Sequence, residues 1–317
     1  MAGIKEVAKT AGVSISTVSY ALNGSDKVSE TTRARIQAVA KSIGYTPKLA
    51  ARTLKGNKTN IIGVYISGFQ GEFYGELLDG MQHQLEKLGY DMMVNSGGRT
   101  HKFLSEKLFD GAIVLDNKFS NEDLQEALKN GNKIVVLDRE VQHENARTVL
   151  LDNASGSRQA VEYLLNQQLD HYSIISGPHG NYDVETRLQS AENYFRQANV
   201  PFDILDGDFT EQAGYEAAEK ILDKSGKQTI GIYSLNDDEA IGFYRYMRQH
   251  HVEISKQFKI VGFDNNHSAD FLYPILPSIS YRKHLWGETA ANTLIDLIEN
   301  KPNTISKIIK TQISFRQ

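Results

Sequence analysis

Residues 4–24 show two short apolar patterns at helical spacing, separated by a glycine. The residues on the two apolar faces are Val7, Ala8 and Ala11 in the first pattern and Val18 and Leu22 in the second. Gly12 permits a tight turn between the patterns, and Ser14 can cap the second helix. The pattern predicts a helix-turn-helix, which presents its second helix to the major groove of DNA, rather than an ordinary helical hairpin.

A third helix and a shorter fourth one follow these two. Ser29 can cap the third helix, whose apolar residues recur at helical spacing until Gly44 ends the pattern. The fourth helix opens with Pro47, which suits a first helical turn, and it has no apolar face of its own. We therefore expect a three-helix unit over residues 1–46 and a short helix with its linker over 47–58.

From residue 60 onward, strand patterns of the buried type alternate with helical ones. Strands are expected at 61–66, 91–94, 111–115, 133–137 and 148–151 in a first series, and at 172–175, 202–205, 229–233 and 259–261 in a second. Helices are expected near 72–88, 155–168, 185–198, 211–223 and 237–249. This alternation predicts parallel sheets with helices on both faces, and two series predict two Rossmann-like subdomains.

The expected core of the protein covers residues 59–317. Its first subdomain would span about 60–150 with a return segment near 278–287, and its second would span about 152–277 and 288–317. Ligands bind to open parallel sheets at the carboxyl ends of the strands, so two facing subdomains predict a cleft between them. The expected fold class is α/β, with a helical N-terminal unit, a linking helix and two doubly wound subdomains.

Charge is distributed unevenly between these parts. Residues 1–58 contain seven lysines and three arginines against three acidic residues, a net charge of +7. The remaining residues contain 25 basic and 36 acidic side chains, a net charge of −11. A small basic unit attached to an acidic body suits the binding of DNA through the basic unit alone.

Composition also bears on the location of the protein. The chain of 317 residues has no cysteine, so disulfides and thiolate metal sites are excluded. It shows neither an apolar leader before a cleavage site nor a run of 18 apolar residues. We therefore expect a cytoplasmic protein that has no membrane partner.

Polar residues follow several strands of the two expected sheets, at the edge where a ligand would bind. The residues in these positions are Asp138, Arg139, Asp152, Asn153, Asn236, Asp237 and Asp264, and Arg187 opens a helix after the loop 177–182. Carboxylates accept hydrogen bonds from adjacent hydroxyl groups and an arginine donates to neighbouring oxygens, so the set suits a polyhydroxylated ligand. A strand-end Asp or Asn can instead cap the next helix, and for Asp152 and Asp237 both interpretations remain open.

The N-terminal helices and the linking helix resemble the headpiece and hinge helix of the lactose-repressor (LacI/GalR) family of bacterial transcription factors, and the resemblance extends over essentially the whole chain. It implies a core like that of periplasmic binding proteins and a homodimer that binds double-stranded operator DNA and a small-molecule effector, without a cofactor. Leu54 would be the hinge-helix residue that inserts into the minor groove and kinks the duplex.

The resemblance also implies which headpiece residues contact DNA. Ile15, Ser16 and Tyr20 would face base edges. Residues near phosphates would be Ser14, Thr17, Ser19, Asn23, Lys27, Ser29, Thr32 and Tyr45, and the expected DNA-binding set is completed by Lys5, Lys48, Ala51 and Leu54. Many relatives carry arginine where this chain has Tyr20, so we expect a different base preference at that half-site position.

By the same resemblance, four of the polar cleft residues match sugar-contacting positions: Asp138, Arg187, Asn236 and Asp264. Phe209 matches an aromatic residue that packs on the ligand ring, and further candidates for the pocket wall are Phe73, Tyr74 and Trp286. The expected function is a repressor of a carbohydrate-use operon, with a mono- or disaccharide as effector. A purine effector or a phosphoprotein corepressor is the alternative.

One segment departs from the family pattern. The connection over residues 95–110 is several residues shorter than usual, so the second helix of the first subdomain should be truncated. This leaves open how that region takes part in the dimer interface. No heptad pattern follows the last strand, so we expect a dimer rather than a tetramer built on a C-terminal helix bundle.

An enzyme is the less favoured interpretation. Paired acids could hydrolyse a glycoside, with bases proposed among His101, His143, His179 and His284. However, the acids lie at separate strand ends, and the sequence has no Walker loop, nucleophile elbow or metal-type histidine spacing. We therefore expect no catalytic or metal-ligating residue. A solute-binding protein of a transport system would share the core but not the headpiece.

Overall fold

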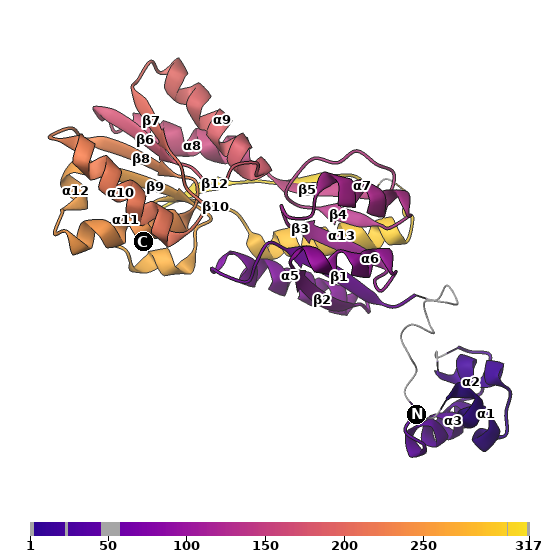
Figure 1. Ribbon diagram of the computed structural model, residues 1–317. Helices are drawn as coiled ribbons and strands as arrows, with labels where there is room; N and C mark the ends of the chain where they lie inside the picture. The colour runs from indigo at the N-terminus through magenta and orange to yellow at the C-terminus, as the bar shows by residue number, and fades with distance from the viewer. Residues whose placement is uncertain (1–2, 23–24, 46–57, 303, 316–317) are drawn as a thin grey trace. The chain divides into compact units, whose positions relative to one another are not determined.

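The computed structural model describes residues 3–22, 25–45, 58–302 and 304–315. It divides into two compact units, Met1–Thr59 and Asn60–Gln317. Figure 1 shows the first as a small helical unit and the second as two α/β subdomains. The expected combination of an N-terminal helix-turn-helix with two parallel-sheet subdomains is confirmed.

The N-terminal unit packs three helices around a small apolar core. These are α1 (Ile4–Ala11), α2 (Ile15–Leu22) and α3 (Glu30–Ser42). Gly12 has a φ of 65°, a left-handed conformation that turns the chain from α1 into α2 at little steric cost. The inward face of α2 consists of Val18 and Ala21, whereas Leu22 is only half-buried. The core is completed by Val7, Ala8, Ala11, Val28, Ile36 and Ala40.

The first subdomain is a six-stranded sheet in the order β11-β5-β4-β3-β1-β2. Its strands are β1 (Ile61–Ile66), β2 (Asp91–Ser96), β3 (Gly111–Leu115), β4 (Ile134–Val136), β5 (Ala146–Leu151) and β11 (Lys307–Ile309), all paired in parallel. Its helices are α5 (Phe73–Lys87), α6 (Lys102–Ser105), α7 (Asn121–Lys129) and α13 (Lys283–Ile298), with a 3-10 turn at Gly98–Thr100. The central strands are buried on both faces, which explains their continuous apolar sequences.

The second subdomain repeats the arrangement in the order β12-β10-β9-β8-β6-β7. Its strands are β6 (His171–Ile175), β7 (Phe202–Leu205), β8 (Ile230–Ser234), β9 (Phe258–Phe263), β10 (Ser278–Ser280) and β12 (Gln312–Ser314). Its helices are α8 (Asn153–Leu165), α9 (Tyr182–Gln197), α10 (Glu211–Ser225), α11 (Asp237–Gln249) and α12 (Ile254–Gln257), followed by the 3-10 turn η2 (His267–Phe271). The pairing of β10 with β12 is antiparallel.

The expected division of the C-terminal part of the chain is wrong. The segment 278–280 forms β10 in the second sheet, although it was assigned to the first subdomain. Conversely, α13 packs along α5, and β11 pairs with β5, so most of 283–309 belongs to the first subdomain. The α13–α5 contact is close because Gly80 and Gly287 lie at the crossing, where a Cβ would meet backbone oxygen at 2.1 and 2.2 Å. The helical pattern of α13 did not indicate which sheet its apolar face would cover.

The two sheets place their strand-order reversals at comparable points. In the first sheet the order reverses between β1 and β3, and in the second it reverses between β6 and β8. Crevices at such switch points, beyond the carboxyl ends of the strands, are where open α/β sheets bind ligands. The shortened connection between β2 and β3 forms only the 3-10 turn and the four-residue α6, as its length predicts. Among the described helices, none has the length and apolar character needed to cross a bilayer.

Candidate nucleic-acid interface and effector cleft

The outer face of α2 carries two large apolar side chains that the fold leaves exposed. Ile15 and Tyr20 are each 42 % exposed. Lys27 lies beside them, with its Nζ 5.1 Å from the centroid of the Tyr20 ring. A cation over an aromatic ring keeps the ring and the charge on one continuous surface. This surface is suited to contact base edges and phosphates together.

The start of α2 is capped by its own side chains. The Ser14 hydroxyl accepts from the Thr17 backbone N–H at 3.1 Å and lies 2.8 Å from the Thr17 hydroxyl. Both hydroxyls are therefore engaged within the turn. The positive end of the α2 dipole still favours an anion at this terminus.

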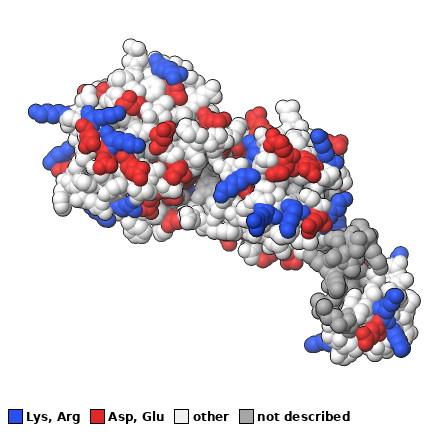
Figure 2. Space-filling model, viewed as in Figure 1, with Lys and Arg blue, Asp and Glu red and all other residues white. Residues whose placement is uncertain are grey.

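The other predicted DNA contacts differ in their exposure. Lys5, Ser16, Lys27 and Ser29 are exposed, whereas Thr17, Ser19, Thr32 and Tyr45 are half-buried. Ser29 caps α3 by accepting from the Thr32 N–H, and Tyr45 packs against the three-helix core. Asn23, Lys48, Ala51 and Leu54 lie outside the described residues, and so does the expected hinge helix. On the face seen in Figure 2, the N-terminal unit presents more basic than acidic side chains.

In the second unit, Arg187 contacts two of the polar residues predicted at strand ends, Asn153 and Asp264. Its Nε donates to Asn153 Oδ1 at 2.8 Å, and its Nη1 donates to the Leu235 carbonyl at 2.7 Å. The guanidinium stacks on the Phe263 ring at 3.5 Å and lies 3.9 Å from Asp264. The position of this buried cation is therefore fixed from several sides.

Asp183 is a member of this cluster that the sequence interpretation missed. Its Oδ1 accepts from Asn153 Nδ2 at 2.7 Å. Burial raises the pKa of Asp183 to about 6, Arg187 opposes the rise, and the charges of Asp138 and Asp264 add to it. The signal was present, because Asp183 precedes Arg187 by four residues and thus lies on the same face of α9. It was missed because it does not directly follow a strand.

Asp138 contributes a carboxylate from the first subdomain. It pairs with Arg139 through contacts of 2.8 and 3.1 Å, and burial raises the pKa of Asp138 although this pairing lowers it. A cavity of about 180 Å³ opens here between the two subdomains. It is lined by Asn117, Asn121, Asp138, Arg139, Gly180, Asn181, Tyr182 and Glu185. Asp138 is therefore the predicted cleft residue that borders open space between the subdomains.

Asp264 stands in an unfavourable backbone conformation beside an aromatic cluster. Its φ is 100°, a region that favours glycine, and strain of this kind is often found at functional sites. Its Oδ1 accepts from the Tyr281 hydroxyl at 2.9 Å. The centroid of the Tyr281 ring lies 5.9 Å from that of Trp286. The Trp286 ring lies 6.2 Å from the ring of Phe73, which in turn packs against Tyr74.

The expectation that Trp286 forms the pocket wall needs correction. Its side chain is fully buried, and its indole N–H donates to the Val149 carbonyl at 2.7 Å. It therefore supports Phe73 and Tyr281 from behind instead of bordering the cleft. The indole was a reasonable candidate because a large aromatic residue near a strand end fits either position.

Asn236 follows a strand, a position compatible with either helix capping or ligand contact, and the structure shows helix capping. It caps α11 by accepting from the Glu239 N–H at 2.9 Å, and its Nδ2 donates to the Phe209 carbonyl at 3.1 Å. Phe209 has a φ of 68°, and its N–H donates to Glu239 Oε1 at 2.9 Å. Asn236 thus holds Phe209 in place, and both the oxygen and the nitrogen of its side-chain amide form hydrogen bonds.

Asp152 and Asp237, for which two interpretations were open, both make structural hydrogen bonds. Asp152 caps α8 by accepting from the Ser155 N–H at 3.2 Å. Asp237 accepts from the Asn266 N–H at 2.7 Å and from the Ser278 hydroxyl at 2.7 Å, which ties α11 to the segment after β9. In the part of the chain that the structure describes, no three His, Asp or Glu side chains are placed to hold a metal ion.

Comparisons with known proteins agree with this arrangement. Residues 3–48 match the family described as "Bacterial regulatory proteins, lacI family", and residues 161–317 match the "Periplasmic binding protein-like domain". The HTH-type transcriptional repressor PurR of Vibrio cholerae serotype O1 (strain M66-2) is 29% identical over 313 residues, which cover 95% of this chain and 93% of that protein.

Two solved structures are also similar. A sugar-binding transcriptional regulator (LacI family) from Enterococcus faecalis is 40% identical, with a TM-score of 0.77, and the match covers 81% of this chain and 97% of that one. The transcriptional regulator CelR in complex with cellobiose is 25% identical, with a TM-score of 0.73, and the match covers 100% of this chain and 99% of that one.

Proposed function

Because this chain belongs to the lacI family of bacterial regulatory proteins, which are DNA-binding transcription regulators, we propose that it is a homodimeric repressor of a carbohydrate-use operon. Its operator affinity would be set by a small sugar bound between the two core subdomains. The observation that carries the effector class is a set of carboxylates near the fixed guanidinium of Arg187: Asp264 lies 3.9 Å from it, and Asp183 interacts electrostatically with both Arg187 and Asp138.

The chemistry of this cluster favours a polyol. Ionised carboxylates accept two or more hydrogen bonds each, and vicinal hydroxyls of a sugar can donate to them while accepting from a guanidinium. Such charge-assisted bonds contribute about 1.5–3 kcal/mol each when they are made in a dry site. The relative from Enterococcus faecalis is described as sugar-binding, and CelR is described in complex with cellobiose, which supports the same class.

A purine is the second candidate, because several similar proteins carry the name PurR. Phe73, Tyr74 and Phe209 could stack on a base. Edge recognition of a purine uses amide side chains that donate and accept at once. The amides of Asn153 and Asn236 are both engaged within the fold. Three further asparagines line the cavity, but each accepts a hydrogen bond through its Oδ1 within the fold, so the acceptors that the cavity wall offers are carboxylates, that of Asp138 among them. This favours a sugar over a purine.

The DNA partner follows from the N-terminal unit. Its net charge of +7 over residues 1–58 contrasts with −11 over the rest, so electrostatic attraction to a duplex would act through the headpiece. Ile15, Tyr20 and Lys27 form the exposed surface of α2 and its flank that we assign to base and phosphate contact. A palindromic operator would match a two-fold dimer.

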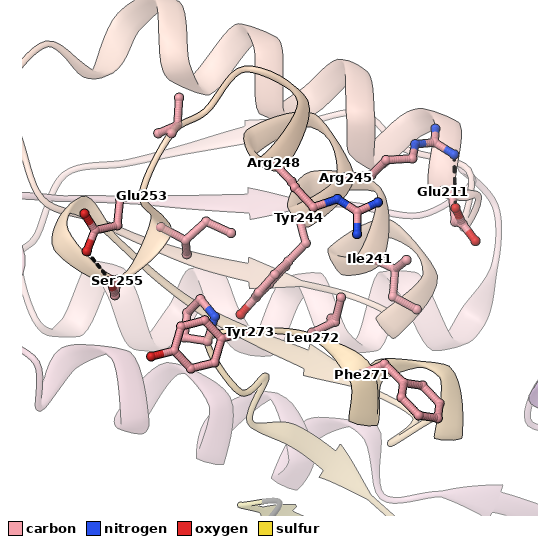
Figure 3. Close-up of a pocket in the computed structure, with 13 residues that line it drawn as sticks. Glu211, Ile241, Tyr244, Arg245, Arg248, Glu253, Ser255, Phe271, Leu272 and Tyr273 are labelled. Carbon is pink, nitrogen blue, oxygen red and sulfur yellow. Dashed lines mark hydrogen bonds and ion pairs between the residues drawn. The ribbon is translucent and has the colours of Figure 1, made fainter.

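The dimer would use the outer face of the second subdomain. A groove of about 680 Å³ lies between α11 and the segment after η2 (Figure 3). Phe271 and Tyr273 beside it are 81 % and 90 % exposed, and exposed aromatic patches of this kind are commonly covered by a partner. Arg245 and Arg248 line the groove together with Glu211 and Glu253. Because the patch carries both basic and acidic side chains, a two-fold-related copy can place an acidic residue opposite each arginine.

Thermal-shift titration of the full chain would test the effector class. We expect a rise in melting temperature with one or more mono- or disaccharides and none with adenine or guanine. The responsive sugar should then change the affinity for a palindromic duplex obtained by selection from random DNA. Stabilisation by the purines alone would establish the second candidate. Failure to select any duplex at low and moderate salt would refute the regulator as proposed.

A further inference from the structure

Asp116 lies at the switch point of the first sheet. It directly follows β3, and Ser67 directly follows β1, so the two residues flank the position where the strand order reverses. The Asp116 side chain is fully buried. Its Oδ1 accepts from the Ser67 hydroxyl at 3.2 Å and from the Lys118 N–H at 3.0 Å. The carboxylate therefore ties together the loops that leave two adjacent strands.

The backbone of Asp116 holds the charged pair of the cleft. Its carbonyl accepts from Arg139 Nη2 at 2.7 Å, and its N–H donates to the Asp138 carboxylate. Ser67, which Asp116 holds, is in turn hydrogen-bonded to Tyr74. Asp138, Arg139 and Tyr74, which border the proposed effector site, therefore depend on the position of Asp116. Asp116 itself does not face the ligand.

The second oxygen of Asp116, Oδ2, faces His101 in the shortened connection between β2 and β3. It lies 3.6 Å from His101 Nε2, and neither atom has a hydrogen-bond partner among the described residues. The other ring nitrogen lies 3.5 Å from Asp123 on α7. The imidazole is packed against Phe119 at 4.1 Å and Tyr65 at 5.7 Å, so its plane is held by aromatic rings.

This near-contact has a physical consequence. A buried donor and a buried acceptor without partners are costly, and native proteins rarely keep them. A water molecule that bridges the two atoms would need a separation of roughly 4.5–5.5 Å, because it forms a hydrogen bond of about 2.8 Å with each. The 3.6 Å gap is too short for such a water, and a shift of well under 1 Å would close it into a direct hydrogen bond.

We propose that Asp116 is a positioning residue for the effector cleft and that His101 holds it in place, which couples the shortened connection to the cleft wall. The inference rests on the proposed function only in taking Asp138, Arg139 and Tyr74 as effector contacts. The connection between β2 and β3 thereby acts on the cleft through a single buried carboxylate. A change at α6 that moves His101 would therefore alter effector affinity without touching the ligand.

Hydrogen–deuterium exchange of the full-length protein tests the coupling without any ligand. His101→Leu preserves bulk but removes the ring nitrogens, and Asp116→Ala removes the carboxylate that fixes the loops after β1 and β3. Both should speed amide exchange in residues 116–119 and 137–139 by roughly fivefold, as expected for the loss of one hydrogen bond. Exchange in 172–175 of the second subdomain should stay unchanged.

Conservative variants separate positioning from general packing. His101→Gln should restore most of the protection, because its amide can donate toward Asp116. Asp116→Asn should keep the bonds that Oδ1 accepts from Ser67 and the Lys118 N–H, and so resemble the wild type in residues 137–139. Asp123→Asn is the matched control, since it removes a charge on the other side of the imidazole. If His101→Leu and Asp116→Ala exchanged no faster at the cleft wall than this control, the proposal would be overturned.

The effect on ligand binding is measured in the same preparations. Operator affinity is determined with and without cellobiose, D-ribose and adenine as probes. Where the wild type responds to a probe, Asp116→Ala should raise the Kd for it at least tenfold while leaving ligand-free operator affinity within twofold. An unaltered Kd would refute the positioning role. If the wild type responds to none of the three probes, the result counts against the proposed effector class. The exchange experiment then decides the coupling by itself.

Discussion

Replacement of Asp183 by asparagine is expected to stabilise the unliganded protein at neutral pH, with a gain that fades as the pH falls. The Asp183 carboxylate is half-buried beside Asn153, and desolvation raises its pKa to about 6 with added repulsion from Asp138 and Asp264. Asparagine has nearly the same shape and keeps an oxygen for the Asn153 amide. The substitution therefore removes the desolvated charge and retains the contact.

The magnitude follows from the pKa shift. A rise from 3.8 to about 6 corresponds to about 3 kcal/mol at 1.36 kcal/mol per unit. A carboxyl whose folded pKa is raised contributes stability below its unfolded pKa, and that contribution is lost as the pH rises through the folded value. Asp183 thus lowers wild-type stability progressively between about pH 4 and pH 7. The asparagine variant lacks this loss, so its advantage should reach about 1–3 kcal/mol near pH 7.5.

Calorimetric melting at about pH 4.5, 6.0 and 7.5 measures this dependence. For a unit of this size, about 1 kcal/mol shifts the Tm by roughly 2–4 °C, so the difference at pH 7.5 should be several degrees. Asp223→Asn on the exposed face of α10 is the matched control, and it should show no comparable pH-dependent gain. An Asp183→Asn variant that melts below the wild type at pH 7.5 would refute the reasoning, because the charge would then be stabilised by Arg187 instead of being costly.

Other substitutions test the remaining parts of the proposal. Asp264→Ala should abolish the effector response in a mobility-shift titration and leave operator binding intact; a normal response would remove Asp264 from the cleft assignment. Tyr273→Asp should raise the dimer Kd at least tenfold in sedimentation experiments, because it puts a charge on the exposed aromatic patch, and an unchanged Kd would exclude this groove as the interface. Tyr20→Phe should weaken specific operator binding roughly fivefold through the loss of one hydrogen bond, with effector affinity unaltered. Leu54→Ala should reduce DNA bending measured by circular permutation, and equal bending would argue against its role as a wedge.

The arrangement of strands could be predicted because burial on both faces leaves a continuous apolar sequence. The expected strands at 61–66 and 111–115 coincide with β1 and β3, whose residues are almost all buried. Helix starts were less well placed. For example, α8 begins at Asn153 because Asp152 caps it, whereas the apolar pattern becomes evident only later. A periodic apolar pattern indicates that a helix exists and which of its faces is apolar. It does not locate the capping residue at which the helix begins.

Long-range pairing could not be obtained in the same way. The apolar face of α13 is compatible with either sheet, and only its fit against α5 at Gly80 and Gly287 selects the first. Similarly, β10 and β11 are three-residue strands whose partners lie far away in sequence. A local pattern carries little information about such pairings, which explains the wrong division of the C-terminal part.

The cleft residues also divide into those that the local sequence predicts and those that depend on long-range contacts. Asp138 and Asp264 were found because parallel strands deliver the residues that follow them to one edge. Asp183 could not be selected by this rule because it lies within α9, and its importance arises from its contact with Asn153. Asp116 directly follows β3 and satisfies the rule, but the sequence does not show that its contacts with Ser67 and Arg139 give it a positioning role. Asn236 was selected, although its amide is engaged in capping, because a cap and a ligand contact require the same residue type at the same place.

The rigidity of the cleft has a consequence for regulation. Arg187 is held by Asn153, the Leu235 carbonyl and the Phe263 ring, so its donors are placed before a ligand arrives and little ordering entropy is lost on binding. Asp138 and Arg187 belong to different subdomains, so a ligand that bonds to both can do so only in a restricted relative position of the two. Part of its binding energy is then specific to that arrangement, and only such a difference can shift operator affinity. A sugar lacking the hydroxyl that reaches Asp138 should therefore still bind through Arg187 but leave operator affinity unchanged.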